Sequence, residues 1–381
     1  MPGFEIIDKK EKLAVSKVFE EGGILFAHGF DKLRKKFHVR EFEEQAKKKI
    51  GTKFALAVTS GTSATLIALK ALGVKKGDEV ITQAFNFIAT VEAIIEAGAK
   101  PIMVNVDETL NMCPKDLKKN ITKKTKVIIP VHMLGVSARM GEIINIAKQK
   151  KIKILEDNCE SMGAKFRNKY LCSLGDAGVV SFDGGKTITC GEGGMIFTNN
   201  KSVYKFCKEY HDHGHELNPK RPRGRDTKTI TGFNYRMTEL QAAVGKEQLK
   251  KLDFIIKQNK LRFNSIYQVI KKTDLIFRLT PNETDPIYDT LIFNCENKKL
   301  RNKIIYILNK SGIGTKNLPD AIEWHCAYYW NHALRSTQIK KLKKTRDILK
   351  QSIAIPMWLK KTSEDYRKLG IKIKLACNTK Y

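Results

Sequence analysis

Short apolar runs alternate with stretches of helical periodicity between about residues 40 and 200. The runs are rich in β-branched residues, and helices are expected between them, for example over 65–72 and 88–97. Because the runs are apolar along most of their length, the pattern predicts an α/β fold with a mostly parallel sheet covered on both faces. The expected strands are 54–58, 79–82, 101–104, 127–131, 152–155 and 179–182.

The pattern changes after this region. Residues 238–270 form one long helical stretch, and the remainder mixes short strands, such as 291–293, with lysine-rich helices. A chain of 381 residues is long for a single core. We therefore expect a large domain over residues 1–250 and a smaller one over 251–381. Residues 218–229 are polar and rich in Pro, Gly and Arg, which predicts a mobile loop.

Composition is that of an ordinary globular protein, with 42% hydrophobic residues. No run approaches the roughly 20 apolar residues that a membrane span needs. The opening segment, Met1-Pro2-Gly3-Phe4-Glu5, lacks a basic stretch followed by an apolar one, so no signal peptide is expected. These features predict a cytoplasmic protein without a membrane partner.

The formal net charge is +30, from 70 Lys and Arg against 40 Asp and Glu. The basic residues are mostly lysines scattered over the whole chain, and no zinc-finger, basic-zipper or RNA-binding signature is present. A solvated basic surface is therefore favoured over a nucleic-acid partner. The remaining alternative is that the positive field attracts a small anionic substrate.

Cysteine and histidine spacing gives little support for a metal site. The eight cysteines contain no CxxC pair, which favours reduced thiols over a disulfide framework or a zinc site. His211, His213 and His215 alternate, so on a strand they would share one face. Because this stretch follows a helix, local hydrogen bonding or substrate contact is favoured, and no metal is expected.

Three clusters of polar and glycine residues fall where predicted strands end, at residues 59–62, 156–158 and 183–186. In sheets of this kind, ligands bind at the edge where the strands end and the loops begin. The sequence therefore predicts one binding site built from these three loops.

The residue types in the clusters match the needs of pyridoxal 5′-phosphate (PLP) chemistry. A lysine must form a Schiff base, a carboxylate must keep the pyridine nitrogen protonated, and backbone N–H groups at a helix N-terminus suit a phosphate. Lys186, Asp157 and the segment 60–62 supply these groups, and Phe87 is a candidate to stack on the ring. Taken singly, each also has an ordinary explanation as a surface lysine, a turn or cap residue, a helix cap or a core phenylalanine.

Taken together, the segments resemble the DegT/DnrJ/EryC1/StrS family of PLP-dependent sugar aminotransferases. The likeness runs from about residue 35 to 250 and more weakly to the end. The resemblance implies the aspartate-aminotransferase-type fold (fold type I), with a large domain and a smaller C-terminal α+β domain. The motifs that carry it are Thr59-Ser60-Gly61-Thr62, Gly77-Asp78-Glu79-Val80, Pro130-Val131-His132, Glu156-Asp157, Gly175-Asp176-Ala177-Gly178, Lys186 with Gly191-Glu192-Gly193-Gly194, and Asn234-Tyr235-Arg236-Met237.

The resemblance also implies a role for each matching residue. Lys186 would form the Schiff base, Asp157 would pair with the pyridine nitrogen, and Phe87 takes the ring-stacking position. Glu160 stands where many relatives have Gln beside the 3′-oxygen of the cofactor. A carboxylate there would repel a phenolate oxygen unless one of the two carries a proton. Some members replace the lysine with His and act as dehydratases, so Lys186 favours transamination.

Further roles concern the phosphate and the oligomer. Ser60, Gly61, Thr62 and Ser181 fall where the family binds the phosphate. Asn234 is similar to the asparagine that reaches the phosphate of the neighbouring subunit. The resemblance therefore implies a homodimer with shared active sites.

Within the family, short segments look most like the branch that aminates the C8 ketone of an oxidised Kdo sugar acid. That reaction gives 8-amino-3,8-dideoxy-manno-octulosonate (8-amino-Kdo) for lipopolysaccharide sugar biosynthesis. Most members act instead on nucleotide-linked 3- or 4-keto sugars, which is the alternative, and glutamate is the expected donor in both cases. The segments are Met1-Pro2-Gly3-Phe4-Glu5, Val131-His132-Met133, residues 186–194, Asp212-His213-Gly214-His215 and Glu323-Trp324-His325.

Substrate contact is predicted for two histidines and one loop. His213 and His325 are candidates, although His325 also fits a packed aromatic cluster with residues 328–330. Arg221, Arg223 and Arg225 suit an anionic sugar, because arginine holds a carboxylate with two parallel hydrogen bonds. The alternative for this loop is a solvated surface.

Two rival functions remain open. One is another PLP reaction, such as dehydration or epimerisation. The other, suggested only by the charge, is a non-catalytic PLP-binding regulatory or nucleic-acid-binding protein.

Overall fold

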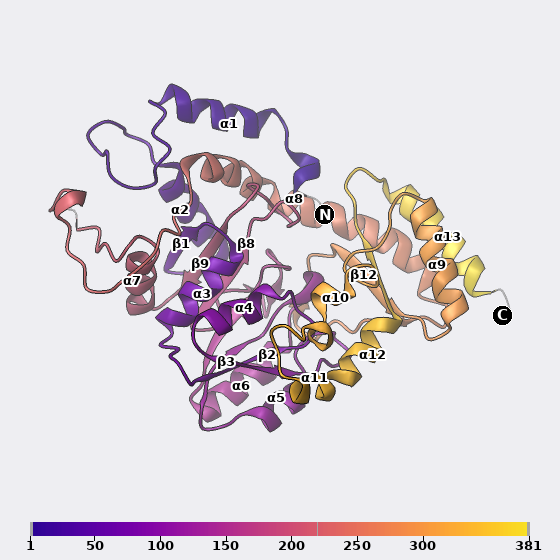
Figure 1. Cartoon of the computed structure of the whole chain (residues 1–381). Helices are drawn as coiled ribbons and strands as arrows, with labels where there is room; N and C mark the ends of the chain where they lie inside the picture. The colour runs from indigo at the N-terminus through magenta and orange to yellow at the C-terminus, as the bar shows by residue number, and fades with distance from the viewer. Residues whose placement is uncertain (1–2, 219, 379–381) are drawn as a thin grey trace.

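The computed structural model describes residues 3–218 and 220–378 (Figure 1). The described chain forms a central seven-stranded sheet flanked by helices and a smaller three-stranded sheet built from its C-terminal third. A second three-stranded sheet is made of two-residue strands. No helix in these two stretches of the chain is both long and apolar enough to cross a membrane.

One strand of the central sheet runs antiparallel to its two neighbours. The strand order is β1-β9-β8-β5-β4-β2-β3, with bounds β1 Phe54–Val58, β2 Glu79–Gln83, β3 Lys100–Val104, β4 Thr125–Ile129, β5 Lys153–Asp157, β8 Ala177–Ser181 and β9 Gly194–Thr198. β9 is antiparallel to β1 and β8, and the other neighbouring pairs are parallel. β1, β5 and β8 therefore run in the same direction, and the loops after them meet at one edge.

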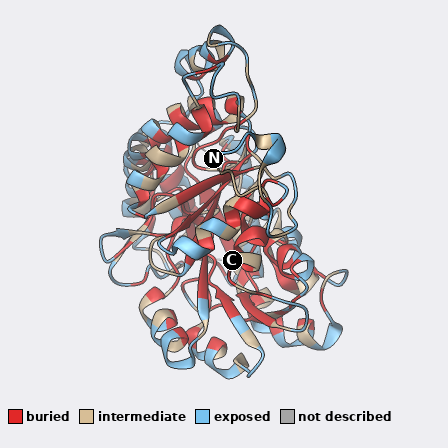
Figure 2. Ribbon diagram, turned by 90° about the vertical axis from the view of Figure 1, so that its left-hand side faces the viewer, coloured by how far each residue is buried: buried red, intermediate tan, exposed pale blue. Residues whose placement is uncertain are grey.

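Helices cover both faces of this sheet. They are α2 (His38–Ile50), α3 (Gly61–Ala71), α4 (Ala89–Glu96), α5 (Pro114–Asn120), α6 (Met140–Lys150) and α7 (Lys201–Tyr210), whereas α1 (Lys9–Glu20) packs on the long helix described below. Alternate strand residues enter different layers: Ile81 and Ile128 join the cluster under α5 and α6, whereas Val80 and Ile129 join the cluster under α3. Figure 2 shows the buried residues concentrated on the strands and on the inner sides of the helices. The sheet is thus apolar on both faces, as the sequence pattern predicts.

A long helix, α8 (Glu239–Ile270), connects the two main sheets. It begins where the Thr238 side chain accepts a hydrogen bond from the backbone of Gln241, as a capping box requires. It packs on α1 and α2, and also on α13 (Ser363–Cys377) of the C-terminal part (Figure 1). Residue 250 lies inside this helix, and the division into domains at that point stays a prediction.

The C-terminal part is built on an antiparallel sheet of order β10-β12-β13. The bounds are β10 Ile276–Phe277, β12 Thr290–Asn294 and β13 Ser352–Pro356, with α9 Lys298–Lys310, α10 Ile322–His325, α11 Ser336–Ile339 and α12 Lys343–Gln351. The small sheet of order β11-β6-β7 pairs β11 Thr284–Asp285 with β6 Lys165–Phe166 and β7 Lys169–Tyr170. The 3-10 helices are η1 Phe4–Ile6, η2 Met133–Gly135, η3 Arg223–Arg225, η4 Ala327–Tyr329 and η5 Lys340–Leu342.

A glycine lets α8 approach α2 closely. A Cβ atom on Gly245 would lie 2.7 Å from the ring of Phe42, which is fully buried and packs on Phe182 at a centroid distance of 5.1 Å. We expect Gly245→Ala to lower the free energy of unfolding by about 1–3 kcal/mol, because this overpacking outweighs the gain in helix propensity. Denaturant unfolding of the full chain measures the change.

Gly141 in α6 is the matched control. The nearest atom to its built Cβ is a ring carbon of Phe166 at 3.4 Å, an ordinary contact distance. Gly141→Ala should leave stability unchanged or raise it by up to about 1 kcal/mol. Equal effects of the two substitutions would contradict the packing argument.

Candidate active site

A cavity of about 380 Å³ opens where β1, β5 and β8 end. Its volume lies in the range typical of small-molecule sites. Most of the residues that the sequence singles out line it: Ser60, Gly61, Thr62, Phe87, Asp157, Glu160, Ser181, Lys186 and His325. The structure therefore brings the three predicted loops together at one place.

Lys186 lies in a tight loop that follows β8. The Lys186 backbone N–H donates to the carbonyl of Asp183 at 3.0 Å, and the Asp183 carboxylate accepts from Gly185 N at 2.9 Å. The loop is closed further along by Thr189, whose hydroxyl donates to the carbonyl of Phe182 at 3.0 Å. The backbone is thus fixed on both sides of the lysine, and its amine is held against the cavity.

The Lys186 amine donates a hydrogen bond to Glu160 Oε1. Burial would raise the pKa of Glu160, but the charges of Lys186 and Lys316 outweigh it and lower the pKa to about 2. Burial would lower the pKa of Lys186, and the Glu160 carboxylate reverses this and raises the pKa above its ordinary value. Lys186 and Glu160 therefore form an ion pair.

Asp157, the last residue of β5, is 4% exposed and has both carboxylate oxygens oriented. Thr90 on α4 donates its hydroxyl to Oδ2 at 2.7 Å, and the backbone of Cys159 donates to Oδ1 at 3.2 Å. Neither partner carries a positive charge. The carboxylate therefore keeps its negative charge available to a cation in the cavity.

The N-terminus of α3 points at the same cavity. Ser60 caps the helix by accepting from Ser63 N at 3.0 Å, whereas the N–H groups of Gly61 and Thr62 make no hydrogen bond within the described residues. A Cβ on Gly61 would lie 2.8 Å from that of Ser181, so the Ser181 hydroxyl lies beside the free N–H groups. Free donors at a helix N-terminus suit an anion, with the helix dipole adding to the attraction.

Aromatic rings form one wall. Phe87 is 42% exposed, and its ring lies 5.5 Å from that of His325 and 6.4 Å from that of Trp324. His325 Nδ1 donates to the carbonyl of Ala321 at 2.9 Å, which leaves Nε2 without a proton. Burial lowers the pKa of His325, so the ring is neutral at pH 7. It lies on the cavity wall, apart from the buried cluster that contains Trp330.

Comparisons with known proteins identify the family. The model of the DegT/DnrJ/EryC1/StrS aminotransferase family matches residues 27–374. The chain belongs to this family. A GDP-perosamine synthase of Escherichia coli O157:H7 is 39% identical over 248 residues, which are 63% of this chain and 67% of that protein. One from Caulobacter vibrioides is 39% identical over 214 residues, 56% of each chain, so the match spans little more than half of that relative.

Solved structures agree on the fold. A GDP-4-keto-6-deoxymannose-3-dehydratase, solved with a trapped PLP-glutamate geminal diamine, is 25% identical and has a TM-score of 0.80. The match covers 97% of this chain and 98% of that one. The protein is thus a PLP-dependent aminotransferase with the large, mostly parallel sheet of fold type I.

The cavity residues of this family member fit PLP. An amine, a buried carboxylate without a cationic partner, a wall of exposed aromatic surface and free N–H groups beside a serine hydroxyl surround one space. Lys186 would hold the cofactor covalently, Asp157 would face its ring nitrogen, and Gly61, Thr62 and Ser181 would hold its phosphate. PLP, once bound, supplies an electron-withdrawing ring to the amino donor.

Other predicted residues lie elsewhere. His213, Asn234 and Arg225 line neither this cavity nor a larger one of about 590 Å³, which Arg221 and Arg223 help to line. No residue lines both cavities, so the larger one is separate from the amine–carboxylate pair. Within one chain, the predicted substrate loop therefore does not reach Lys186.

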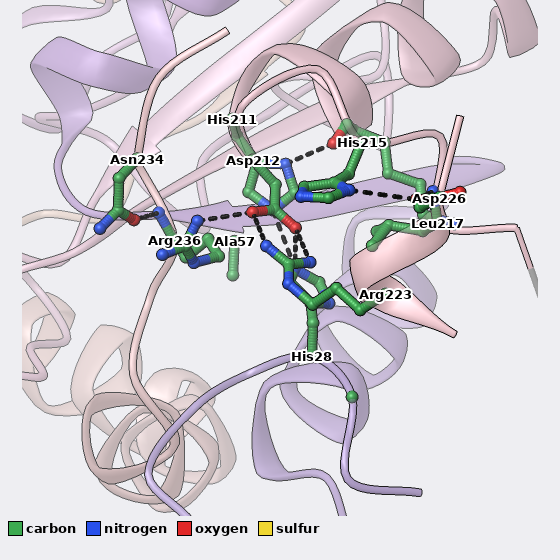
Figure 3. A network of polar contacts seen from close by, with 12 residues as sticks. His28, Ala57, His211, Asp212, His215, Leu217, Arg223, Asp226, Asn234 and Arg236 are labelled. Atoms are coloured by element: carbon green, nitrogen blue, oxygen red, sulfur yellow. Dashed lines mark hydrogen bonds and ion pairs between the residues drawn. The ribbon is translucent and has the colours of Figure 1, made fainter. Parts of the chain in front are cut away.

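Asp212 holds this loop in place (Figure 3). Its buried carboxylate accepts from both Nη atoms of Arg223 and from Arg236, and Asn234 forms a backbone bridge with Asp212. Burial would raise the pKa of Asp212, but hydrogen bonding to Arg223 and the surrounding positive charges hold it below its ordinary value. Arg223 therefore has a structural partner within the chain, and its predicted contact with substrate stays a prediction. Arg221 and Arg225 are exposed.

The three alternating histidines do not share a face. His211 donates from Nδ1 to the carbonyl of Lys208, so its Nε2 accepts from His28 at 3.2 Å. His213 is exposed, and His215 lies 3.3 Å from Asp226. Among the described residues, no group of three or more His, Cys, Asp or Glu side chains could hold a metal ion. Local contacts account for His211 and His215.

Sequence reasoning missed Thr90, Asn317 and Lys316. Thr90 and Asn317 line the cavity, and Lys316 contacts Glu160. Thr90 had a weak signal, as a polar residue at the start of a mostly apolar helix. Lys316 had none, because one lysine among many carries no pattern.

The contact between Thr90 and Asp157 allows a graded test. Asp157→Asn removes the charge, and we expect the half-reaction with glutamate to slow by at least roughly a hundredfold, on the order of 3 kcal/mol in the barrier. Thr90→Val keeps the charge and removes only an orienting hydrogen bond, so about tenfold is expected. Stopped-flow absorbance follows the reaction, and dialysis checks that both variants retain PLP. A normal rate in Asp157→Asn would rule out its role.

Proposed function

We propose that this protein transfers an amino group from glutamate to a nucleotide-linked keto sugar. The main observation behind this proposal is that Lys186, Asp157 and the N-terminus of α3 line the same cavity. The sugar assignment is supported by the relatives that are named GDP-perosamine synthases. Glutamate is supported by the solved relative in which PLP and glutamate are trapped together.

The residues divide the work as follows. Lys186 releases the cofactor to the donor and then moves a proton at the donor α-carbon, for which it must lose its own proton. Asp157 keeps a positive charge on the ring nitrogen favourable throughout. His325, with an unprotonated Nε2 on the cavity wall, accepts a hydrogen bond from an acceptor hydroxyl.

An oxidised Kdo sugar acid is the second candidate acceptor. Four of the five segments that carry this narrower resemblance lie at the site. Val131, Lys186 and His325 line the cavity, and a Cβ on Gly3 would lie 2.6 Å from the carbonyl of Lys186. The named relatives support the nucleotide-linked sugar instead. Both acceptors are anionic, which agrees with the net charge of +30.

Product analysis tests these alternatives. Purified protein with glutamate is offered GDP-4-keto-6-deoxymannose, a nucleotide-linked 3-keto sugar and a Kdo acid oxidised at C8, and mass spectrometry detects the amino sugar. We expect amination of a nucleotide-linked sugar and no product from Lys186→Ala. Amination of the Kdo acid alone would replace the first candidate with the second, and no product from any acceptor would refute both.

We also propose a homodimer with shared active sites, in the cytoplasm. Asn234 is exposed and does not line the cavity of its own chain, and the adjacent Phe233 is 56% exposed. Asn234 would complete the phosphate site of the other subunit. The exposed Arg221 and Arg225 would then lie near an anionic acceptor bound in that subunit.

Hybrid dimers test the shared site. Lys186→Ala and Asn234→Ala should each be inactive alone. Mixed under conditions of subunit exchange, they should regain partial activity, because one of the two sites in each hybrid is intact. Two different affinity tags allow the hybrid to be isolated before the assay. Isolated hybrids with no activity, from variants that both fold, would contradict the shared site.

A further inference from the structure

Four ionisable side chains form a buried row beside the cavity. Lys186 donates to Glu160 Oε1, Lys316 Nζ lies 3.8 Å from Glu160 Oε2, and Lys316 also donates to Asp289 Oδ2 at 2.6 Å. The Lys316 side chain is only 7% exposed and that of Glu160 8%. Glu160 thus lies between two ammonium groups, and only one of them, Lys186, takes part in the proposed chemistry.

The row crosses from one part of the protein to the other. Glu160 and Lys186 belong to loops of the central sheet, whereas Lys316 is attached to the C-terminal sheet, where its backbone N–H donates to Ala354 of β13 at 2.9 Å. Asp289 is fixed there as well, because its carbonyl accepts from Met357 at 2.9 Å. Lys316 therefore reaches Glu160 from a separately anchored element.

Asp289 restrains Lys316 but is not itself saturated. Its Oδ1 has no hydrogen-bond partner among the described residues, and Gly135 leaves it room, since a Cβ there would lie 2.5 Å from that oxygen. Lys316 is consequently shared between two carboxylates. A change at Asp289 should alter how much of its charge Glu160 receives.

A buried carboxylate is costly unless it is paired with a cation or accepts several hydrogen bonds, and the Glu160 carboxylate contacts Lys186 and Lys316. Lys186 cannot serve in this way, because the proposed function requires it to become neutral or covalently attached. Lys316 has no such requirement. A glutamine at position 160 would need no second cation.

We propose that Lys316 is a positioning residue that shares the Glu160 carboxylate with Lys186 and retains it whenever Lys186 gives up its positive charge. Lys316 thereby sets how strongly Glu160 holds the proton of Lys186. This inference rests on the proposed role of Lys186 in binding PLP.

Three other ionisable groups lie near the pair. Cys159 and Asp183 face Lys186, and His325 faces Glu160. Burial raises the pKa of Cys159 and lowers that of His325, so both are neutral at pH 7.5. A change in the pH dependence of Lys186 is therefore attributable to the row of charges.

The test is the rate at which PLP attaches to Lys186 in the full chain freed of cofactor, followed by the visible absorption band against pH. Only the neutral amine attacks, so the rate rises with pH. Lys316→Met leaves Glu160 facing Lys186 alone and removes a repelling cation, and both effects stabilise the ammonium. Attachment at pH 7.5 should slow by about tenfold, one unit of pKa.

Three matched variants define the mechanism. Lys316→Arg keeps the charge and should retain a rate close to wild type. Glu160→Gln removes the carboxylate and should speed attachment by about tenfold, and the double variant Glu160→Gln/Lys316→Met should return near the wild-type rate because the two charges cancel. Pyridoxal, which lacks the phosphate, should show the same ratios, so attraction of the phosphate by Lys316 is excluded as the cause.

A Lys316→Met protein that folds and attaches PLP with the wild-type rate and pH profile would overturn the proposal, even if its stability falls. If Lys316→Met does not fold, Asp289→Asn decides. It frees Lys316 to face Glu160, so attachment should be faster by at least about twofold, and an unchanged rate overturns the proposal. Failure of the wild-type chain itself to attach PLP would instead refute the proposed function.

Discussion

The ion pair between Lys186 and Glu160 is the interaction on which the site depends. Two opposite charges are kept out of water only when further groups satisfy them, and here the surrounding sheet supplies those groups. Three strands of one direction end at this point, and the loops after them lead to the amine, the carboxylates and the helix whose free N-terminal N–H groups suit an anion. The central sheet and the helices packed on it fix the positions of these loops.

The support is rigid where the chemistry demands fixed atoms. The loop that carries Lys186 is closed by its own hydrogen bonds. It is bonded to the carbonyl of Phe182, whose ring packs on Phe42. The Asp157 carboxylate is oriented by the Thr90 hydroxyl of α4 on one oxygen and by the backbone N–H of Cys159 on the other. The polar loop that carries Asn234 is also held, by Asp212, although Asn234 does not line the cavity of its chain.

Much of the fold could be predicted from local patterns. The apolar runs locate the parallel strands to within two or three residues, because a strand buried on both faces has few polar positions. Helix α3 begins at Gly61, four residues before the apolar stretch predicts, because the capping by Ser60 extends it. β9 is not among the predicted strands, and it begins at Gly194, the last residue of the glycine-rich segment 191–194, which hides its start.

The site could be predicted only as far as its groups come from the ends of those strands. Lys186, Asp157 and Gly61 have this origin, so sequence order and fold class already imply that they meet. Asn317 lines the cavity and Lys316 contacts Glu160, and both belong to the C-terminal part. Arg223 donates to Asp212 of its own chain. Such contacts depend on how distant segments pack, and no local spacing encodes them.

The length of α8 has a mechanical consequence. Its 32 residues form a rod of roughly 48 Å that packs against both parts of the protein. A continuous helix of this kind resists bending, so a clamshell motion about residue 250 would have to break its hydrogen bonds. We therefore expect access to the cavity to depend on movements of short segments around it, such as 316–325, while α8 stays straight.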